Sequence, residues 1–164
     1  MLVRPAVKAD HRWRVALLTE HFGSPLVVGH GVVYDAAALP ALMCIDSAGD
    51  RAGVLSYQIA NGQLEIVSID AKTHRQGTGT ALLEAAISVA RSEGCSRAWL
   101  VTTNDNLDAL RFYQRRSWRL VQVNRDAVDF ARVLKPLIPK VGAYGIEIHD
   151  EIELEYALPR SHNH

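Results

Sequence analysis

One stretch of the chain, residues 64–93, limits its fold more than any other. A β-rich apolar run over residues 64–69 leads into a loop that contains Gly77 and Gly79. An apolar pattern follows in which hydrophobic residues recur every three or four positions, as they do on one face of a helix. These residues predict a strand, a glycine loop and a helix over residues 77–93, in that order.

The strand at residues 64–69 is the last of three β-rich runs, the others being residues 41–45 and 53–60. Asn61-Gly62 separates the last two runs, and Asn-Gly between apolar runs is a strong signal for a β-hairpin. The middle of the chain is therefore predicted to be an antiparallel meander.

The flanking segments alternate between helix and strand. Asp10 is a suitable N-cap for a helix that ends near Phe22. Further predicted strands are residues 2–4, 98–102, 118–123 and 151–158; predicted helices are residues 106–116 and 127–134, with a short helix at 36–39 as one alternative. The last strand alternates apolar residues with Glu151, Glu153 and Glu155, which predicts a half-exposed strand.

Composition excludes several classes of protein. The chain has 164 residues, is 48% hydrophobic and 22% charged, and has zero formal net charge. We expect one domain over residues 1–159 and a flexible tail at 160–164. Zero net charge argues against nucleic-acid binding, and no apolar run is long enough for a membrane span. Two cysteines without C-x-x-C spacing fit a reducing, cytoplasmic location.

The glycine loop suggests a phosphate site, because a helix N-terminus carries partial positive charge and glycines let a ligand approach the backbone. A Walker loop requires G-x-x-x-x-G-K-[ST], which is absent, and a Rossmann loop requires glycine where Leu82 stands. From these residues alone, the alternative remains that the two glycines serve only a tight turn.

Two motifs resemble the GNAT family of N-acetyltransferases. Residues 67–83 resemble the family's acetyl-CoA-binding segment, in which a strand, a [Q/R]-x-x-G-x-[G/A] loop and a helix follow one another. The spacing of Asn106, Ala109, Tyr113 and Trp118 resembles the family's N-x-x-A-x-x-x-Y-x-x-x-G-[FW] segment. Ser117 stands where the family has glycine, so a positive φ there would strain it mildly.

This resemblance implies a GNAT-like α/β (α+β) fold: a mixed, mostly antiparallel central sheet, splayed near its middle, with helices on both faces. It implies direct transfer of the acetyl group of acetyl-CoA to an amine acceptor, which is a small molecule or a protein amine, in a ternary complex. A homodimer is also possible for a protein of this kind, and the resemblance does not decide it. The alternative is a catalytically weak acyl-CoA-binding sensor or interaction module on the same fold.

The resemblance also implies the residues that bind acetyl-CoA. The backbone of Val67 and Ile69 would pair with the pantetheine, and backbone N–H groups of the loop would hold the pyrophosphate. His74 stands at the family's Gln/Arg position, and Arg75 beside it supplies a cation. The full implied set is Val67, Ser68, Ile69, His74, Arg75, Gln76, Gly77, Thr78, Gly79, Thr80, Asn106 and Tyr113.

Two residues are candidates for catalysis. Tyr113 matches the family's general acid, which protonates the leaving thiolate; the alternative is an aromatic residue that only packs. Glu65 is the candidate base, because strand alternation would place it on the face of Val67 and Ile69; the alternative is a solvent-facing glutamate. Tyr57 and His30 are weaker candidates. The histidines show no metal-ligand spacing, so no metal is expected.

Overall fold

The computed structural model describes residues 1–73 and 77–159, and these residues form two compact units. Among the described residues, the first unit holds residues 1–27, 34–73, 77–98 and 158–159, and the second holds residues 28–33 and 99–157. In the part of the chain that is described, no helix is both long and apolar enough to cross a membrane. The expectation of one domain over residues 1–159 stays a prediction.

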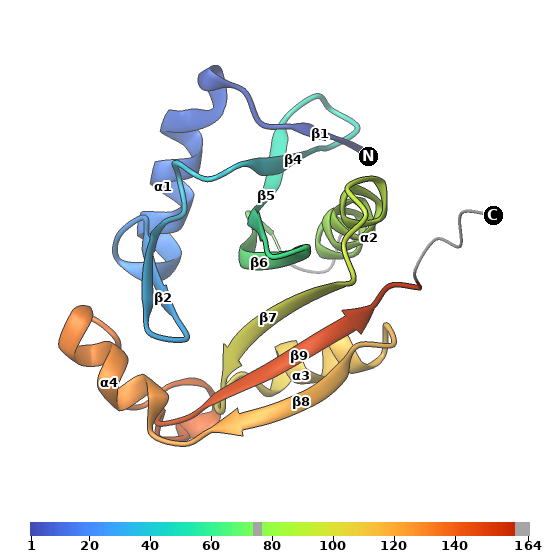
Figure 1. Cartoon of the computed structure of the whole chain (residues 1–164). Coiled ribbons are helices and arrows are strands. Elements are labelled where there is room, and N and C mark those ends of the chain that lie inside the picture. The colour runs from blue at the N-terminus through green and yellow to red at the C-terminus, as the bar shows by residue number, and fades with distance from the viewer. Residues whose placement is uncertain (74–76, 160–164) are drawn as a thin grey trace. The chain divides into compact units, whose positions relative to one another are not determined.

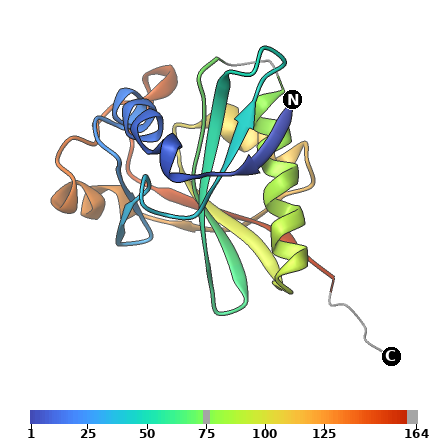
Figure 2. The ribbon, with the colours of Figure 1, turned by 90° about the horizontal axis from the view of Figure 1, so that it is seen from above.

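The first unit is built on four antiparallel strands in the order β1-β4-β5-β6. Two helices pack against them (Figures 1 and 2). The strands are β1 (Leu2–Pro5), β4 (Ala41–Ile45), β5 (Arg51–Ala60) and β6 (Gln63–Ala71); the helices are α1 (His11–Phe22), with a 3-10 turn η1 (Lys8–Asp10) before it, and α2 (Thr78–Ser92).

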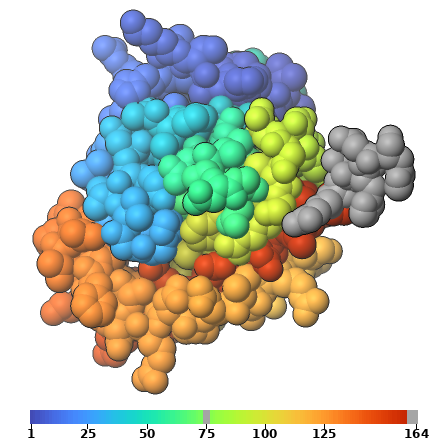
Figure 3. Space-filling view, in the orientation of Figure 1, coloured from blue at the N-terminus to red at the C-terminus, as the bar shows by residue number. Residues whose placement is uncertain are grey.

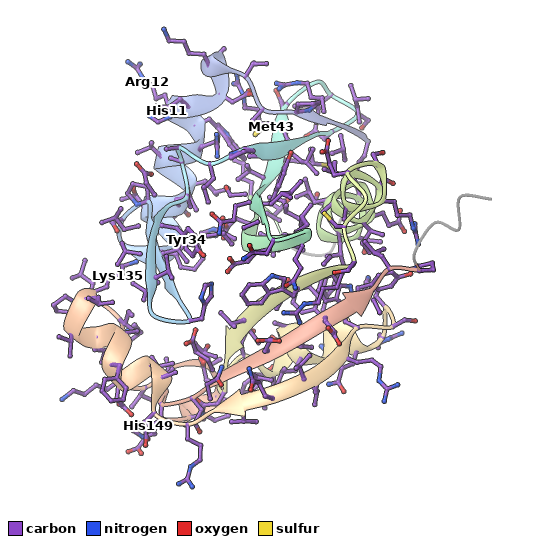
Figure 4. The ribbon with its side chains drawn as sticks, in the orientation of Figure 1. His11, Arg12, Tyr34, Met43, Lys135 and His149 are labelled. Atoms are coloured by element: carbon purple, nitrogen blue, oxygen red, sulfur yellow. The ribbon has the colours of Figure 1, made fainter. Side chains whose placement is uncertain are left out.

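The two helices cover opposite faces of these strands. Leu17 of α1 packs with Val54 and Met43 in one core cluster; Figure 4 labels Met43 on β4. A Cβ placed on Gly53, the neighbour of Val54, would lie 3.2 Å from Leu82 of α2. Since consecutive strand residues point to opposite faces, α1 lies on one side of β5 and α2 on the other.

A β-bulge interrupts β6. Ser56 of β5 pairs with Ser68, but the next residue, Tyr57, pairs with Ile66. Val67 is therefore an extra residue with no partner on β5, and the bulge shifts the alternation of side chains along the strand. This irregularity decides which residues of β6 share a face.

The second unit is built on three strands in the order β7-β9-β8, and β8 and β9 pair antiparallel. The strands are β7 (Arg97–Thr103), β8 (Arg119–Asn124) and β9 (Glu151–Ala157); the helices are α3 (Leu107–Gln114), α4 (Ala127–Leu134) and a 3-10 turn, η2 (Ala143–Gly145). Helix α4, orange in Figure 3, lies at the surface of this unit. Its Phe130 and Val133 are exposed.

The segment before β4 forms a pair of short strands, β2 (Leu26–Gly29) and β3 (Val32–Asp35), joined by His30 and Gly31. The alternative of a short helix at residues 36–39 is wrong, because these residues form turns. The other predicted strands and helices are confirmed within a few residues. The expected fold class, a mixed α/β protein with mostly antiparallel strands, is also confirmed.

Asp10 does not cap α1 with its side chain. Its buried carboxylate accepts hydrogen bonds from Arg4 and Arg51, both at 2.8 Å, and from the Val7 N–H at 2.7 Å. The bond from Arg4 is the largest cause that holds the pKa of Asp10 well below its usual value. Hydrogen bonds from two arginines therefore hold a carboxylate that local sequence alone would assign to the N-terminus of α1.

The exposed glutamate face expected on β9 is also wrong in part. Glu151 and Glu153 are buried, with 5% and 9% of their surface exposed. The Glu151 carboxylate accepts a hydrogen bond from the His30 N–H at 3.1 Å, and Glu153 accepts one from Gln122 at 3.3 Å. These partners satisfy carboxylates that the alternating pattern alone would assign to solvent.

Candidate active site

The entrance to α2 has the features that a phosphate site requires. Gly77, the N-cap, has φ +78°, a left-handed conformation that side chains disfavour. The first bond of the helix ladder runs from the Ala81 N–H to the Gly77 carbonyl at 3.0 Å. The backbone N–H groups of Thr78, Gly79 and Thr80 therefore precede the ladder at the positive end of a 15-residue helix.

Gly53 of β5 brings this helix entrance close to the strands. A Cβ at Gly53 would lie 2.6 Å from the Thr78 methyl group and 2.8 Å from the Asp70 carbonyl. The Thr78 side chain is buried there, so its contribution to a ligand site is its backbone. His74, Arg75 and Gln76 lie outside the described residues.

The strand that precedes the loop is the one expected to contact the pantetheine, and that contact stays a prediction. The bulge leaves Val67 without a partner on β5, whereas Ser68 and Ile69 pair with Ser56 and Leu55. An unpaired bulge residue has backbone groups that are not committed to the ladder on that side. Ser68 is buried, and its hydroxyl has no hydrogen-bond partner in the described part of the chain.

Glu65 lies on a different face from the one expected. It pairs with Gln58, which shares its face with Ser56, and Ser56 pairs with Ser68. The bulge thus places Glu65 with Ser68 and on the opposite face from Ile69, because the extra residue reverses the alternation. The alternative of a solvent-facing glutamate is also wrong, since only 3% of Glu65 is exposed.

The Glu65 carboxylate is held by a tyrosine that sequence reasoning missed. Tyr34 belongs to β3 and is labelled in Figure 4. Its hydroxyl donates to Glu65 Oε1 at 2.7 Å. Gln58 Nε2 in turn lies 3.3 Å from the Tyr34 oxygen and donates to it. No local motif could indicate this contact, because Tyr34 and Glu65 are 31 positions apart in the sequence.

The same face of β5 and β6 carries two further charged groups. Arg14 of α1 donates to the carbonyls of Ala36 and Leu39, each at 2.8 Å. His21 Nδ1 lies 2.9 Å from Asp70 Oδ1, and burial raises the pKa of Asp70. This face of the first unit therefore carries polar groups beside the apolar cluster of Leu17, Met43 and Val54, and the charged groups named here lie against specific partners.

In the second unit, Asn106 is the N-cap of α3. Its Oδ1 accepts the Ala109 N–H at 3.2 Å, and its Nδ2 donates to Thr102 Oγ1 at 3.2 Å. The capping role considered for this residue is confirmed. Its contact with the cofactor stays a prediction.

Tyr113 is 4% exposed and belongs to an aromatic cluster. Its ring centroid lies 5.2 Å from that of Phe112 and 5.4 Å from that of Trp118. The backbone N–H of Trp118 donates to the backbone carbonyl of Tyr113 at 3.1 Å, across a turn in which Ser117 has φ +70°. The strain foreseen at Ser117 is thus present, and packing of Tyr113 is established, while its role as an acid stays a prediction.

The two weaker candidates for a base occupy other positions. Tyr57 pairs with Ile66 and so lies on the opposite face of β5 from Gln58 and Glu65. In the second unit, the His30 ring lies 5.0 Å from the Trp99 ring, centroid to centroid.

Comparison with known proteins supports the family indicated by these motifs. The model of the Acetyltransferase (GNAT) family matches residues 16–118. YdhI of Bacillus subtilis (strain 168), described as an uncharacterized protein, is 34% identical over 152 residues, which cover 93% of this chain and 95% of YdhI.

Solved structures show the same fold at low sequence identity. The IAA acetyltransferase from Bacillus cereus ATCC 14579 has a TM-score of 0.72 and 20% identity, covering 96% of this chain and 99% of its own. A GNAT family acetyltransferase from Elizabethkingia anophelis with acetyl-CoA bound also has a TM-score of 0.72, with 16% identity and coverage of 96% and 97%.

Acetyl-CoA is the co-substrate of this family, which confirms the expected co-substrate. The left-handed Gly77, the N-terminus of α2 and the bulge at Val67 fit a ligand with a pyrophosphate and an extended chain. With the family model matched over residues 16–118 and a relative at 34% identity, this chain belongs to the GNAT family of acetyltransferases.

Proposed function

We propose that this protein is an N-acetyltransferase that transfers the acetyl group of acetyl-CoA directly to an acceptor amine in a ternary complex. The observation that carries the proposal is the arrangement on β6. A buried carboxylate, Glu65, precedes the bulge at Val67, and the strand then leads to the left-handed Gly77 at the entrance of α2.

The residues proposed to hold acetyl-CoA follow the path of the chain. The backbone of Val67 and Ile69 would bond to the pantetheine, and the backbone N–H groups at the start of α2 would hold the pyrophosphate. Asn106 and Tyr113 complete the proposed set from the second unit. When bound, acetyl-CoA supplies an acetyl group activated as a thioester.

Glu65 is proposed as the general base. An acceptor amine is protonated near neutral pH and must lose a proton before its nitrogen can attack a carbonyl carbon. The Glu65 carboxylate accepts this proton, either directly or through one water molecule. Its burial removes competing water, and the bond from Tyr34 fixes the position of Oε1.

Tyr113 is proposed as the general acid. As the new C–N bond forms and the C–S bond breaks, the electron pair of the C–S bond leaves on sulfur. A thiol has a pKa of about 8.5 and a phenol of about 10, so a phenol close to the sulfur can supply the proton. The net products are the acetylated amine, a free thiol and one proton.

Release of free thiol from acetyl-CoA across a panel of amines tests this function. The panel should contain small mono- and diamines, amino acids and peptides with free N-termini or lysines. We expect thiol release with at least one class and a loss of about 100-fold in kcat for Glu65→Gln, at unchanged affinity for acetyl-CoA.

Two outcomes would count against the proposal. Tight acetyl-CoA binding without thiol release for any acceptor would favour the sensor alternative; the absence of a carboxylate from Leu100 to Thr103 of β7 is compatible with that alternative. A loss below threefold for Glu65→Gln in an active enzyme would assign the base to another group.

A further inference from the structure

A hydroxyl–carboxylate pair connects β3 to β6. The Tyr34 hydroxyl donates to Glu65 Oε1 at 2.7 Å, and both residues are buried. We propose that Tyr34 is a positioning residue that holds the Glu65 carboxylate in one orientation by donating a hydrogen bond to it. This inference rests on the proposed role of Glu65 as the base.

The neighbouring contact fixes the direction of the hydrogen bond. Gln58 Nε2 donates to the Tyr34 oxygen at 3.3 Å, so that oxygen acts as an acceptor toward β5. A hydroxyl has one hydrogen to donate, and in this arrangement it is directed to Glu65. The order of donation is Gln58 to Tyr34 to Glu65.

A hydrogen bond donated to a carboxylate favours the charged form. Tyr34 can keep this role over the whole working pH range, since burial and the neighbouring Glu65 raise the pKa of its hydroxyl well above the ordinary value. The hydroxyl therefore stays protonated where the enzyme works, and it opposes the cost of burying the negative charge of Glu65.

The other ionisable groups on this face of the first unit are placed against other partners. Arg14 of α1 donates to backbone carbonyls, and His21 of α1 is paired with Asp70 of β6 at 2.9 Å. Burial raises the pKa of Asp70, so a pH profile of Tyr34 variants must be compared with wild type over the same range. A change confined to the Tyr34 variant then reports on Glu65.

The test is the pH dependence of kcat/KM for Tyr34→Phe, measured with an acceptor found in the amine panel. Without the donor, the carboxylate loses a hydrogen bond that favours its charged form, so the acidic limb of the profile should move to higher pH. At a pH on that limb the rate should fall about tenfold, which is what one charge-assisted hydrogen bond typically contributes. Affinity for acetyl-CoA should stay unchanged.

Tyr144→Phe is the matched control. The Tyr144 hydroxyl also donates to a carboxylate, Asp108, at 2.6 Å, but Tyr144 is exposed and belongs to the second unit. We expect this variant to leave the acidic limb in place. Gln58→Met removes the donor to Tyr34 while keeping its length, and it should move the limb in the same direction by a smaller amount.

The outcomes separate this inference from the proposed function. If Glu65→Gln lowers kcat about 100-fold but Tyr34→Phe leaves the acidic limb within about 0.2 pH units of wild type, the positioning role is wrong and the base assignment stands. A uniform drop in rate at every pH, together with a lower Tm, would show a purely structural role and would also overturn it. Full activity in Glu65→Gln would instead refute the base itself.

Discussion

At the scale of single residues, Tyr113 poses the sharpest test, because the structure establishes its packing between Phe112 and Trp118 and leaves its hydroxyl as the functional question. Tyr113→Phe keeps the ring and removes only the hydroxyl. If that hydroxyl protonates the leaving thiolate, kcat should fall about 100-fold, since the charge that it neutralises develops in the transition state.

Steady-state kinetics distinguish the roles of Tyr113. A rise in KM for acetyl-CoA at constant kcat would show a binding role, and unchanged kinetics would show that Tyr113 only packs. Tyr156→Phe is a suitable control, because Tyr156 lies against Trp118 in the same cluster, with ring centroids 6.0 Å apart. We expect this control to keep its turnover.

At the scale of secondary-structure elements, the prediction concerns the N-terminus of α2. Gly77→Ala places a side chain at φ +78°, which costs on the order of 1 kcal/mol. The expected relief of this strain is a change in the backbone at the helix entrance, which would turn N–H groups away from the pyrophosphate. We expect the Kd for acetyl-CoA, measured by calorimetry, to rise at least tenfold.

Gly49→Ala is the matched control for this helix entrance. Gly49, in the turn between β4 and β5, has φ +85°, and a Cβ added there, as at Gly77, would meet no atom of the described residues within 4 Å. Both variants should lose similar stability, but Gly49→Ala should bind acetyl-CoA like wild type. Equal affinity in both variants would place the pyrophosphate away from α2.

At the scale of the whole molecule, the network of Asp10 with Arg4 and Arg51 links stability to pH. The folded-state pKa of Asp10 is lowered, chiefly by the hydrogen bond from Arg4. Its contribution to stability is therefore fully present above the unfolded-state pKa of about 3.9 and is lost as the pH falls below that value toward the lower folded-state pKa.

Asp10→Asn should accordingly lower the free energy of unfolding at pH 7 by about 2 kcal/mol, because it removes the charge that two arginines share. The loss is smaller than for a fully buried ion pair, since the Arg4 and Arg51 side chains are 33% and 36% exposed. Urea unfolding at pH 7 and at pH 3 measures it, and the difference between variant and wild type should shrink at pH 3. An equal difference at both pH values would contradict the ionic origin.

The sequence by itself determined the kinds of elements and their order. The helical spacing after Gly79, the Asn61-Gly62 turn and the order of strands along the chain depend on neighbours within a few residues, where backbone preferences act. The two GNAT motifs are local in the same sense, since each runs from a strand or loop into one helix. These features could therefore be predicted from the sequence alone.

Only the tertiary structure decided which side chains meet. The bulge at Val67 moved Glu65 to the opposite face, because register depends on the pairing of β5 with β6 and not on β6 alone. Tyr34 reaches Glu65 across 31 residues, and Arg51 reaches Asp10 across 41. Contacts between such distant residues leave no periodic trace in the sequence, since hydrogen bonds and burial are set by where the folded chain brings each group.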